Sequence, residues 1–201
     1  MESLKFGQSV RQNQFNDELI FIFQNVRWYF LIWSNQTLFL LAQTQYFFAY
    51  IGIASALVFA NLGAAYGTAK SAVGISSLAV IDKSKIFQGL IPIIMAGILG
   101  IYGVIIAVIA GSQVKGLASS NSLTEQQGYQ YLGAGLACGL SSLAAGLAIG
   151  VAGDAGVRAY AQTDDIFVGM ILILIFAEAI GLYGLIVSII MIFWAVMVNI
   201  K

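Results

Sequence analysis

The chain has 201 residues, of which 60% are hydrophobic and 9% charged, against roughly 45–50% apolar residues in an average soluble domain. Its nine acidic and nine basic residues cancel, so net charge gives no reason to expect a nucleic-acid partner. With no histidine and a single cysteine, Cys138, the chain can form no internal disulfide, His–Cys zinc site or histidine-dependent triad. The composition predicts an all-α integral membrane protein without a cofactor or metal.

The N-terminal extension, residues 1–45, starts polar and continues into an interrupted apolar segment over residues 19–42. On a helical wheel, polar residues such as Gln24 and Arg27 lie opposite apolar residues such as Val26. This pattern predicts either an amphipathic helix at the membrane interface or a fifth spanning helix with its polar side inward. A third interpretation, an artefact of the gene model, also stays open.

Four later segments are long and apolar enough to cross a hydrocarbon core, which takes about 20 helical residues. Strands are disfavoured, because lipid leaves an open backbone unsatisfied and a barrel would show alternating polarity. We therefore expect two helical hairpins, at residues 46–120 and 121–201. The predicted spans are residues 46–68, 87–111, 129–152 and 166–194.

The connections between these spans differ in basic residues. The first and third connections hold four, Lys70, Lys83, Lys85 and Arg158, whereas the second holds only Lys115. Because connections rich in lysine and arginine stay in the cytosol, we place the first and third connections there. The second connection and the C-terminus are then expected on the opposite side.

The chain contains an internal duplication with one fixed offset, in which position 100 corresponds to position 181. At this offset, "GIYG" at 100–103 falls on "GLYG" at 181–184, and "YIG" at 50–52 falls on "YLG" at 131–133. Several matches at one fixed offset indicate two tandem hairpins of the same topology. In this register Gly97 falls on Glu178, so only the second copy holds an acid.

Small residues recur every three or four positions in the first and third spans, a pattern typical of helices whose backbones approach closely. Two interpretations stay open, packing inside one bundle and packing between subunits of a larger assembly. We favour the assembly, because the stripes are long and these helices present few bulky faces. The glycines expected at contacts within a ring are Gly63, Gly67, Gly139, Gly146 and Gly150.

The last span, "MILILIFAEAIGLYGLI" at 170–186, contains a single acid, Glu178. It lies about twelve residues, or roughly 18 Å, into its helix, close to the midplane of a hydrocarbon core about 30 Å thick. An ionised acid costs several kcal/mol at that depth, so we expect the protonated form. The face expected to support it offers no counter-charge and consists of Ile175, Gly181, Leu182 and Tyr183.

Two roles remain for Glu178. It is either a neutral packing group that is hydrogen-bonded to another helix, or a carrier that gains a proton on one side and loses it on the other. The carrier explains better why an acid is tolerated, and it requires a partner chain that supplies a cation and water paths. Two other classes stay open: a small proton-coupled transporter with aromatic residues around a cationic substrate, and a structural pore or fusion protein.

Four stretches of the sequence match one known family: "ANLGAAYGTAKSAVGI", "IPIIMAGILGIYGVIIAVI", "LAAGLAIGVAGDAGVRAYAQ" and "FVGMILILIFAEAIGLYGLI". Together they resemble the proteolipid c-subunit family of the vacuolar-type proton ATPase. The resemblance covers about residues 46–191 and all four spans. It implies a ring of proteolipids that turns against a stationary a-subunit, driven by ATP hydrolysis in a separate soluble sector, with Glu178 as the proton-carrying acid.

The resemblance also implies partners and a location. The expected partners are other c-type proteolipids, the a-subunit with its arginine and half-channels, the d-subunit, and the soluble V1 sector through the central stalk. The expected location is a vacuolar or other acidic endomembrane. The chain has no phosphate-binding loop of the Walker type, so we expect no catalytic residue and no ATP hydrolysis in it. Gly97 favours the ordinary c type over the c double-prime relative, which carries its acid in the earlier hairpin.

Overall fold

The computed structural model describes residues 44–119 and 123–197. The fold below is that of the unit formed by residues 44–201. The helix predicted over residues 19–42 lies outside the described residues, so both of its interpretations stay predictions.

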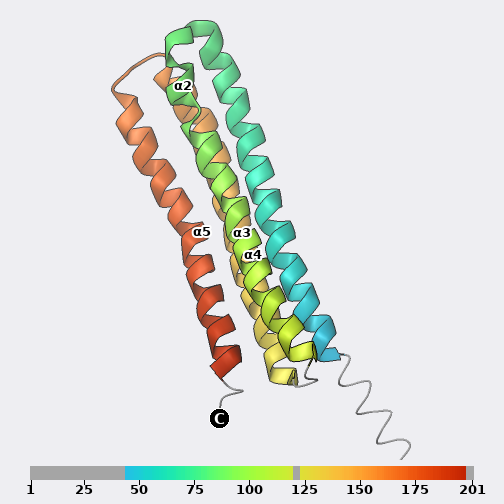
Figure 1. Cartoon of the computed structure of the whole chain (residues 1–201). Coiled ribbons are helices and arrows are strands. Elements are labelled where there is room, and N and C mark those ends of the chain that lie inside the picture. The colour runs from blue at the N-terminus through green and yellow to red at the C-terminus, as the bar shows by residue number, and fades with distance from the viewer. Residues whose placement is uncertain (1–43, 120–122, 198–201) are drawn as a thin grey trace, which may run out of the picture. The chain divides into compact units, whose positions relative to one another are not determined.

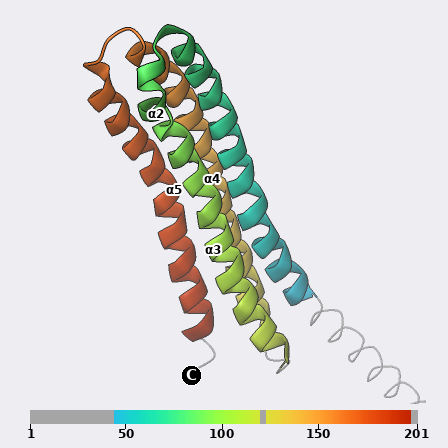
Figure 2. The same ribbon diagram turned by 45° about the horizontal axis from the view of Figure 1, so that its top comes forward.

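Every regular element in the described residues is a helix. Four long helices run side by side, with the connections 82–90 and 161–165 at the same end of the bundle (Figures 1 and 2). The fold prediction is therefore confirmed. In chain order the elements are the first helix Thr44–Ile81, the 3-10 turn η1 Lys83–Lys85, α2 Ile86–Gly89, α3 Ile91–Ser119, α4 Glu125–Tyr160 and α5 Ile166–Met197.

Local sequence signals explain where α3 and α4 begin. Pro92 is the second residue of α3, in the first helical turn, where the missing N–H of proline costs no hydrogen bond. Thr124 caps α4 in a reciprocal arrangement: its Oγ1 accepts from the backbone N–H of Gln127 at 3.4 Å, and its own N–H donates to Gln127 Oε1 at 2.9 Å.

The helices are longer than the predicted spans. The third span was expected to end at Ala152, but α4 has 36 residues and continues to Tyr160. Asp154 and Arg158 lie inside this helix and pair with each other at 2.8 Å, one helical turn apart. Apolarity therefore marks the part of a helix that lies in lipid, whereas backbone hydrogen bonding carries the helix further.

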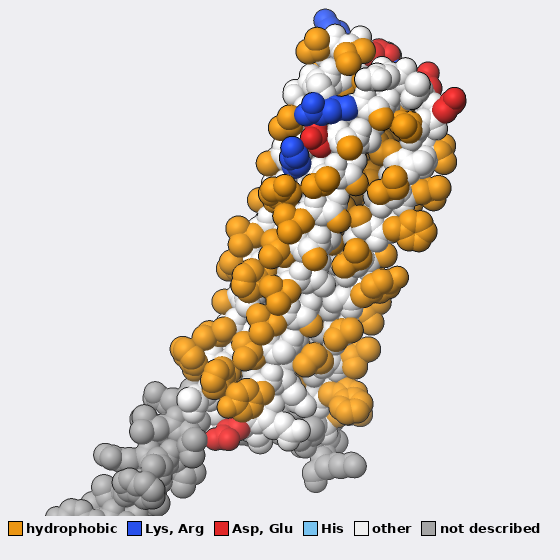
Figure 3. Space-filling view, turned by 180° about the vertical axis from the view of Figure 1, so that it is seen from behind, with side chains coloured by type: hydrophobic (Ala, Val, Ile, Leu, Met, Phe, Trp, Pro, Cys, Tyr) orange, Lys and Arg blue, Asp and Glu red, His pale blue; other side chains and the backbone are white. Residues whose placement is uncertain are grey.

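The outer surface of the bundle is apolar along most of its length. On the face shown in Figure 3, hydrophobic side chains cover the helices, and nearly all the charged side chains gather at one end. Many large apolar side chains are exposed, and Phe176, for example, is 73% exposed. A soluble monomer rarely exposes an apolar surface of this extent. In the described residues, four helices are long and apolar enough to cross a membrane. The protein is a multi-pass integral membrane protein.

The first helix and α4 pack through their small residues. A Cβ atom added to Gly63 would lie 2.6 Å from the carbonyl oxygen of Ser142, and one added to Gly146 would meet the backbone of Gly63. The stripes therefore pack inside one chain, and a further role between copies stays a prediction. The glycines predicted at ring contacts, Gly63, Gly67, Gly139, Gly146 and Gly150, are all buried in this way.

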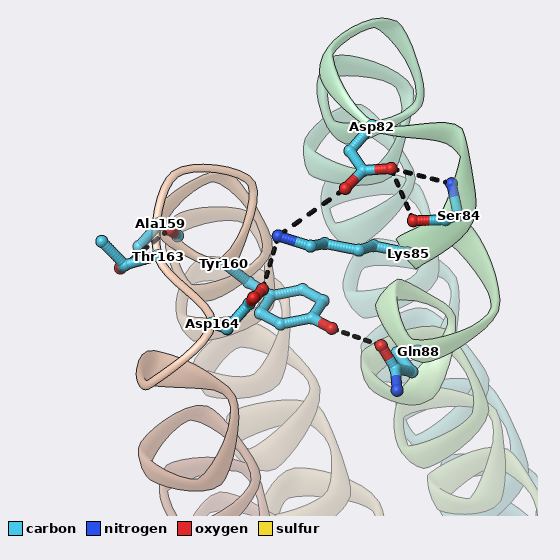
Figure 4. Close-up of polar contacts among 8 residues, drawn as sticks. All are labelled: Asp82, Ser84, Lys85, Gln88, Ala159, Tyr160, Thr163 and Asp164. Carbon is cyan, nitrogen blue, oxygen red and sulfur yellow. Dashed lines mark hydrogen bonds and ion pairs between the residues drawn. The ribbon is translucent and has the colours of Figure 1, made fainter.

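A polar cluster joins the two connections at one end of the bundle, and we call it the loop clasp (Figure 4). Lys85 Nζ lies 2.5 Å from Asp164 Oδ1 and 3.7 Å from Asp82 Oδ2, and 5.1 Å from the centre of the Tyr160 ring. The Tyr160 hydroxyl donates to Gln88 Oε1. The loop clasp, Asp82, Lys85, Gln88, Tyr160 and Asp164, links the first hairpin to the second.

Candidate functional site

The acid of the last helix has a partner on another helix. The hydroxyl of Tyr102, in α3, donates a hydrogen bond to Oε1 of Glu178, in α5, over 3.0 Å. Tyr102 is only 9% exposed, whereas Glu178 is half-buried. The carboxyl group is therefore held against α3 and remains accessible from outside the described bundle.

Close packing of α3 and α5 brings these two residues together. Gly181 lies one helical turn after Glu178, and a Cβ atom added to it would lie 2.7 Å from Leu99 Cδ2 and 3.4 Å from Ala145 Cβ. A larger residue at 181 would meet the end of the Leu99 side chain, so either that side chain or α5 would have to shift. Gly181 thus lies where α5 meets α3, and its support of Glu178 stays a prediction.

The other predicted supporting residues lie elsewhere on α5. Ile175, Leu182 and Tyr183 are 49%, 38% and 65% exposed, so they form part of the outer surface of the described bundle. The structure brings Gly181 to the contact with α3, but it leaves these three side chains facing outward. Their support of Glu178 stays a prediction.

Sequence reasoning missed Tyr102, because it considered only the neighbours of Glu178 along its own helix. A signal was present in the duplication. Tyr102 lies five positions after Gly97, and Tyr183 lies five positions after Glu178. A tyrosine at the same place in both copies indicates a hydroxyl that serves the acid across the hairpins.

The position in the first hairpin that corresponds to Glu178 has free space beside it. Gly97 is exposed, and a Cβ atom built on it would have no atom of the described residues within 4 Å. The absence of an acid at this position therefore does not follow from lack of space inside the chain.

No basic side chain of the described residues contacts Glu178. The salt bridges of residues 44–119 and 123–197 all lie toward the end that carries the loop clasp, and the described residues hold no group of metal-ligand side chains. A carboxyl group with one neutral hydrogen-bond donor and no fixed counter-charge is suited to binding and releasing a proton.

Two apolar hairpins with one acid in the final span define a membrane proteolipid. The sequence model of the ATP synthase C-subunit family matches residues 51–110 and 132–191. The second matched range begins and ends at the same offset from the first range that separates position 181 from position 100. This agreement confirms the predicted duplication.

Relatives of the chain include named subunits of one pump. The V-type proton ATPase 16 kDa proteolipid c-subunit of Ascaris suum is 56% identical over 145 residues, which is 72% of this chain and 89% of the relative. The corresponding proteolipid of Chrysotila carterae is 58% identical over 146 residues, with the same coverage, and the human c-subunit is 52% identical over 145 residues, 72% of this chain and 90% of the relative. The chain belongs to the family of V-type proton ATPase 16 kDa proteolipids, within the wider family of ATP synthase C-subunits.

Proposed function

We propose that this protein is a proton-carrying ring subunit in the membrane sector of a V-type proton ATPase. Glu178 would take up and release one proton each time it passes the stationary a-subunit. The observation that carries the proposal is the acid itself, half-buried near the middle of α5 and bonded, among residues 44–119 and 123–197, to the neutral hydroxyl of Tyr102 alone.

The carrying step uses the neutral acid. A protonated carboxyl group crosses the apolar zone without the cost of a bare charge, and the Tyr102 hydroxyl occupies one of its oxygens. The same hydroxyl can donate to the carboxylate after the proton leaves. Tyr102 therefore holds the side chain in one place through both states.

The releasing step requires groups that the described residues do not supply. An arginine of the a-subunit would favour the ionised form of Glu178 as the acid comes close to it. Water-filled half-channels in the a-subunit would deliver and remove the proton. ATP would be hydrolysed in the V1 sector, connected through the central stalk and the d-subunit, so this chain itself is not an enzyme. The acidified compartment would be a vacuole or a similar organelle.

Replacing Glu178 tests the proposal most directly. In Glu178→Gln the amide keeps the size and the bond to Tyr102 but has no proton that can be released or taken up near neutral pH. We expect ATP-driven acidification of isolated vesicles to be lost, with ring assembly on native gels unchanged. Glu125→Gln, an exposed acid at the start of α4, serves as the matched control and should acidify normally.

A hydrophobic carbodiimide gives an independent measurement. It reacts with protonated carboxyl groups in apolar sites, so we expect one modified residue, Glu178, and loss of transport in proportion to labelling. Normal acidification by Glu178→Gln vesicles, or labelling at another carboxyl group with transport lost, would overturn the assignment.

A further inference from the structure

The two hairpins pack against each other through faces that have counterparts on the outside of the chain. Gly146 of α4 packs on the backbone of Gly63 in the first helix. In the register of the duplication, Gly146 corresponds to Ala65, which is small and exposed, and Gly63 corresponds to Ala144, also small and exposed. The internal contact therefore has a complementary pair of faces that no described residue of this chain covers.

The local geometry of the two hairpins supports this extension. A Cβ atom added to Gly100 would lie 3.5 Å from Ala64 Cβ, and one added to Gly181 would lie 3.4 Å from Ala145 Cβ. The second pair is the first pair moved to the other copy of the duplication, so the packing within each hairpin is nearly identical at this level. A second copy of the chain can consequently dock on the outer side of the second hairpin as the second hairpin docks on the first.

The bond between Tyr102 and Glu178 then has a predictable counterpart between copies. In the register of the duplication, Tyr102 corresponds to Tyr183 of the same copy. Glu178 then corresponds to Gly97 of the next copy. Tyr183 is 65% exposed and Gly97 has open space around it, as this arrangement requires.

We propose that Tyr183 of one copy packs into the open space at Gly97 of a second copy and that its hydroxyl bonds there to the side chain of Asn61. This inference rests on the ring assembly of the proposed function. Asn61 is exposed, and its Oδ1 lies 2.9 Å from the position of a Cβ atom on Gly100, one turn from Gly97. An amide and a phenol that face lipid separately are each costly, whereas a bond between them satisfies both.

The proposal gives the ring two kinds of contact between α3 and α5. Inside one copy, a tyrosine holds an acid that exchanges a proton. Between copies, the corresponding tyrosine holds an amide that does not ionise. The second contact is closed to proton transfer and contributes to the cohesion of the ring.

Cross-linking in native membranes tests the contact. In a Cys138→Ala background, which removes the native thiol, the pair Gly97→Cys and Tyr183→Cys should give a ladder of dimers and larger products with a short bis-methanethiosulfonate reagent. The control pairs Gly97→Cys with Leu182→Cys, because residue 182 is exposed at the same height but rotated by about 100° around α5.

The control ladder should be reduced several-fold. An intact ring on a native gel without a Tyr183 ladder, or with equal ladders for both pairs, would overturn the proposal. The proposed function would be untouched by that result, since its test is the loss of acidification in Glu178→Gln.

Carbodiimide labelling gives a second arm that does not depend on cross-linking. In the variant Gly97→Glu combined with Glu178→Gln, the new carboxyl group should be labelled. Adding Tyr183→Phe should change its labelling rate several-fold, whereas adding Tyr102→Phe should not. In the chain that keeps Gly97 and Glu178, the labelling rate of Glu178 should change with Tyr102→Phe and not with Tyr183→Phe. If the labelling of both acids depended on Tyr102, the contact would be contradicted.

The role of Asn61 is tested by a double-mutant cycle. Tyr183→Phe and Asn61→Leu should each lower the temperature at which the purified ring dissociates. The double variant should dissociate at no lower temperature than the less stable of the two single variants. Strictly additive losses would show that the two side chains do not interact.

Discussion

The two hairpins share a fold and differ in how their helices are held together. In the second hairpin, the Ser188 hydroxyl lies 2.6 Å from the carbonyl oxygen of Ala134, and Gln127 Nε2 donates to the carbonyl oxygen of Ala195 at 2.9 Å. In the first hairpin the position of Ser188 is occupied by Ala107, which has no hydroxyl.

Close packing of small residues occurs in both hairpins, and a Cβ atom added to Gly184 in α5 would lie 2.7 Å from the carbonyl oxygen of Ala137. A Cβ atom added to Gly103 in α3 would lie 2.5 Å from Ala60 Cβ and 2.6 Å from the carbonyl oxygen of Ala56. Directional bonds fix the rotation of a helix about its axis more tightly than contact between small residues does. The helix that bears the acid has the bonds from Gln127 and Ser188 in addition to close packing, and we expect them to keep Glu178 turned toward Tyr102.

The largest effect is expected from shortening the acid. Glu178→Asp keeps a proton carrier but withdraws the carboxyl group from Tyr102, which breaks the 3.0 Å bond. We expect proton transport to fall on the order of tenfold or more, since a misplacement of about 1 Å has effects of this size or larger in catalytic sites. Dye quenching in vesicles measures it, and transport equal to the parent would show that the bond to α3 has no role in placing the acid.

The next effect concerns the packing of the first hairpin. Gly103→Ala forces α3 away from the first helix, and we expect the loss of about 1–3 kcal/mol of stability that overpacking causes. Gly111→Ala is the control, because its Cβ would have no described atom within 4 Å, and it should gain up to about 1 kcal/mol in helix propensity. Thermal unfolding in detergent, followed by circular dichroism, compares them. Equal effects would mean that the first hairpin is not held by this contact.

Removing a directional bond from the second hairpin should cost less. Ser188→Ala deletes the bond to Ala134, and interhelical bonds of this kind are worth about 0.6 kcal/mol, with a maximum near 1.7. Ser112→Ala is the control, because that exposed hydroxyl donates to the carbonyl oxygen of Ile109 in its own helix. If the bond also orients α5, the Ser188→Ala variant should show faster carbodiimide labelling of Glu178 and the Ser112→Ala variant should not.

The smallest effect is expected at the loop clasp that joins the hairpins. Hydrogen bonds from the Ser84 side chain and backbone, followed by the charge of Lys85, hold the pKa of Asp82 below its ordinary value of 3.8. A lowered pKa in the folded state means that the ionised acid stabilises the fold above that value and that the contribution is lost as the pH falls through the folded pKa.

Melting curves of Asp82→Asn and the parent should therefore differ slightly at pH 7 and converge under strong acid. Salt should reduce the difference at neutral pH, because Asp82 and Lys85 are only partly buried. Asp165→Asn, an exposed acid of the other connection, is the control. A gap between the curves of Asp82→Asn and the parent that widens on acidification would contradict the argument.

Much of the fold could be predicted from the sequence, because a membrane imposes a simple rule on length and apolarity. The spans, the duplication and the presence of an acid in only one of the two copies can all be recognised from the order of residues along the chain. The ends of the helices were less predictable. Hydropathy falls at the first charged residues, such as Asp154, whereas the helix continues as long as backbone bonds and side-chain pairs support it.

The site was predicted only in part, for a related reason. Glu178 is conspicuous by itself, but Tyr102 lies 76 residues earlier, and its role depends on how closely two helices approach. Gly181 lies against Leu99 where these two helices meet, a contact that no periodicity encodes. The glycine stripes posed the same difficulty, since a smooth face is equally suited to a helix of the same chain and to one of a neighbour.

The 36-residue length of α4 has a mechanical consequence. A helix of that length measures about 54 Å at 1.5 Å per residue, while the hydrocarbon core is about 30 Å thick. The part of α4 that packs against α5 within the membrane therefore continues beyond the membrane as one unbroken helix. A force applied at the charged end would reach the level of Glu178 through continuous helix and the salt bridges around Asp154, with little elastic slack.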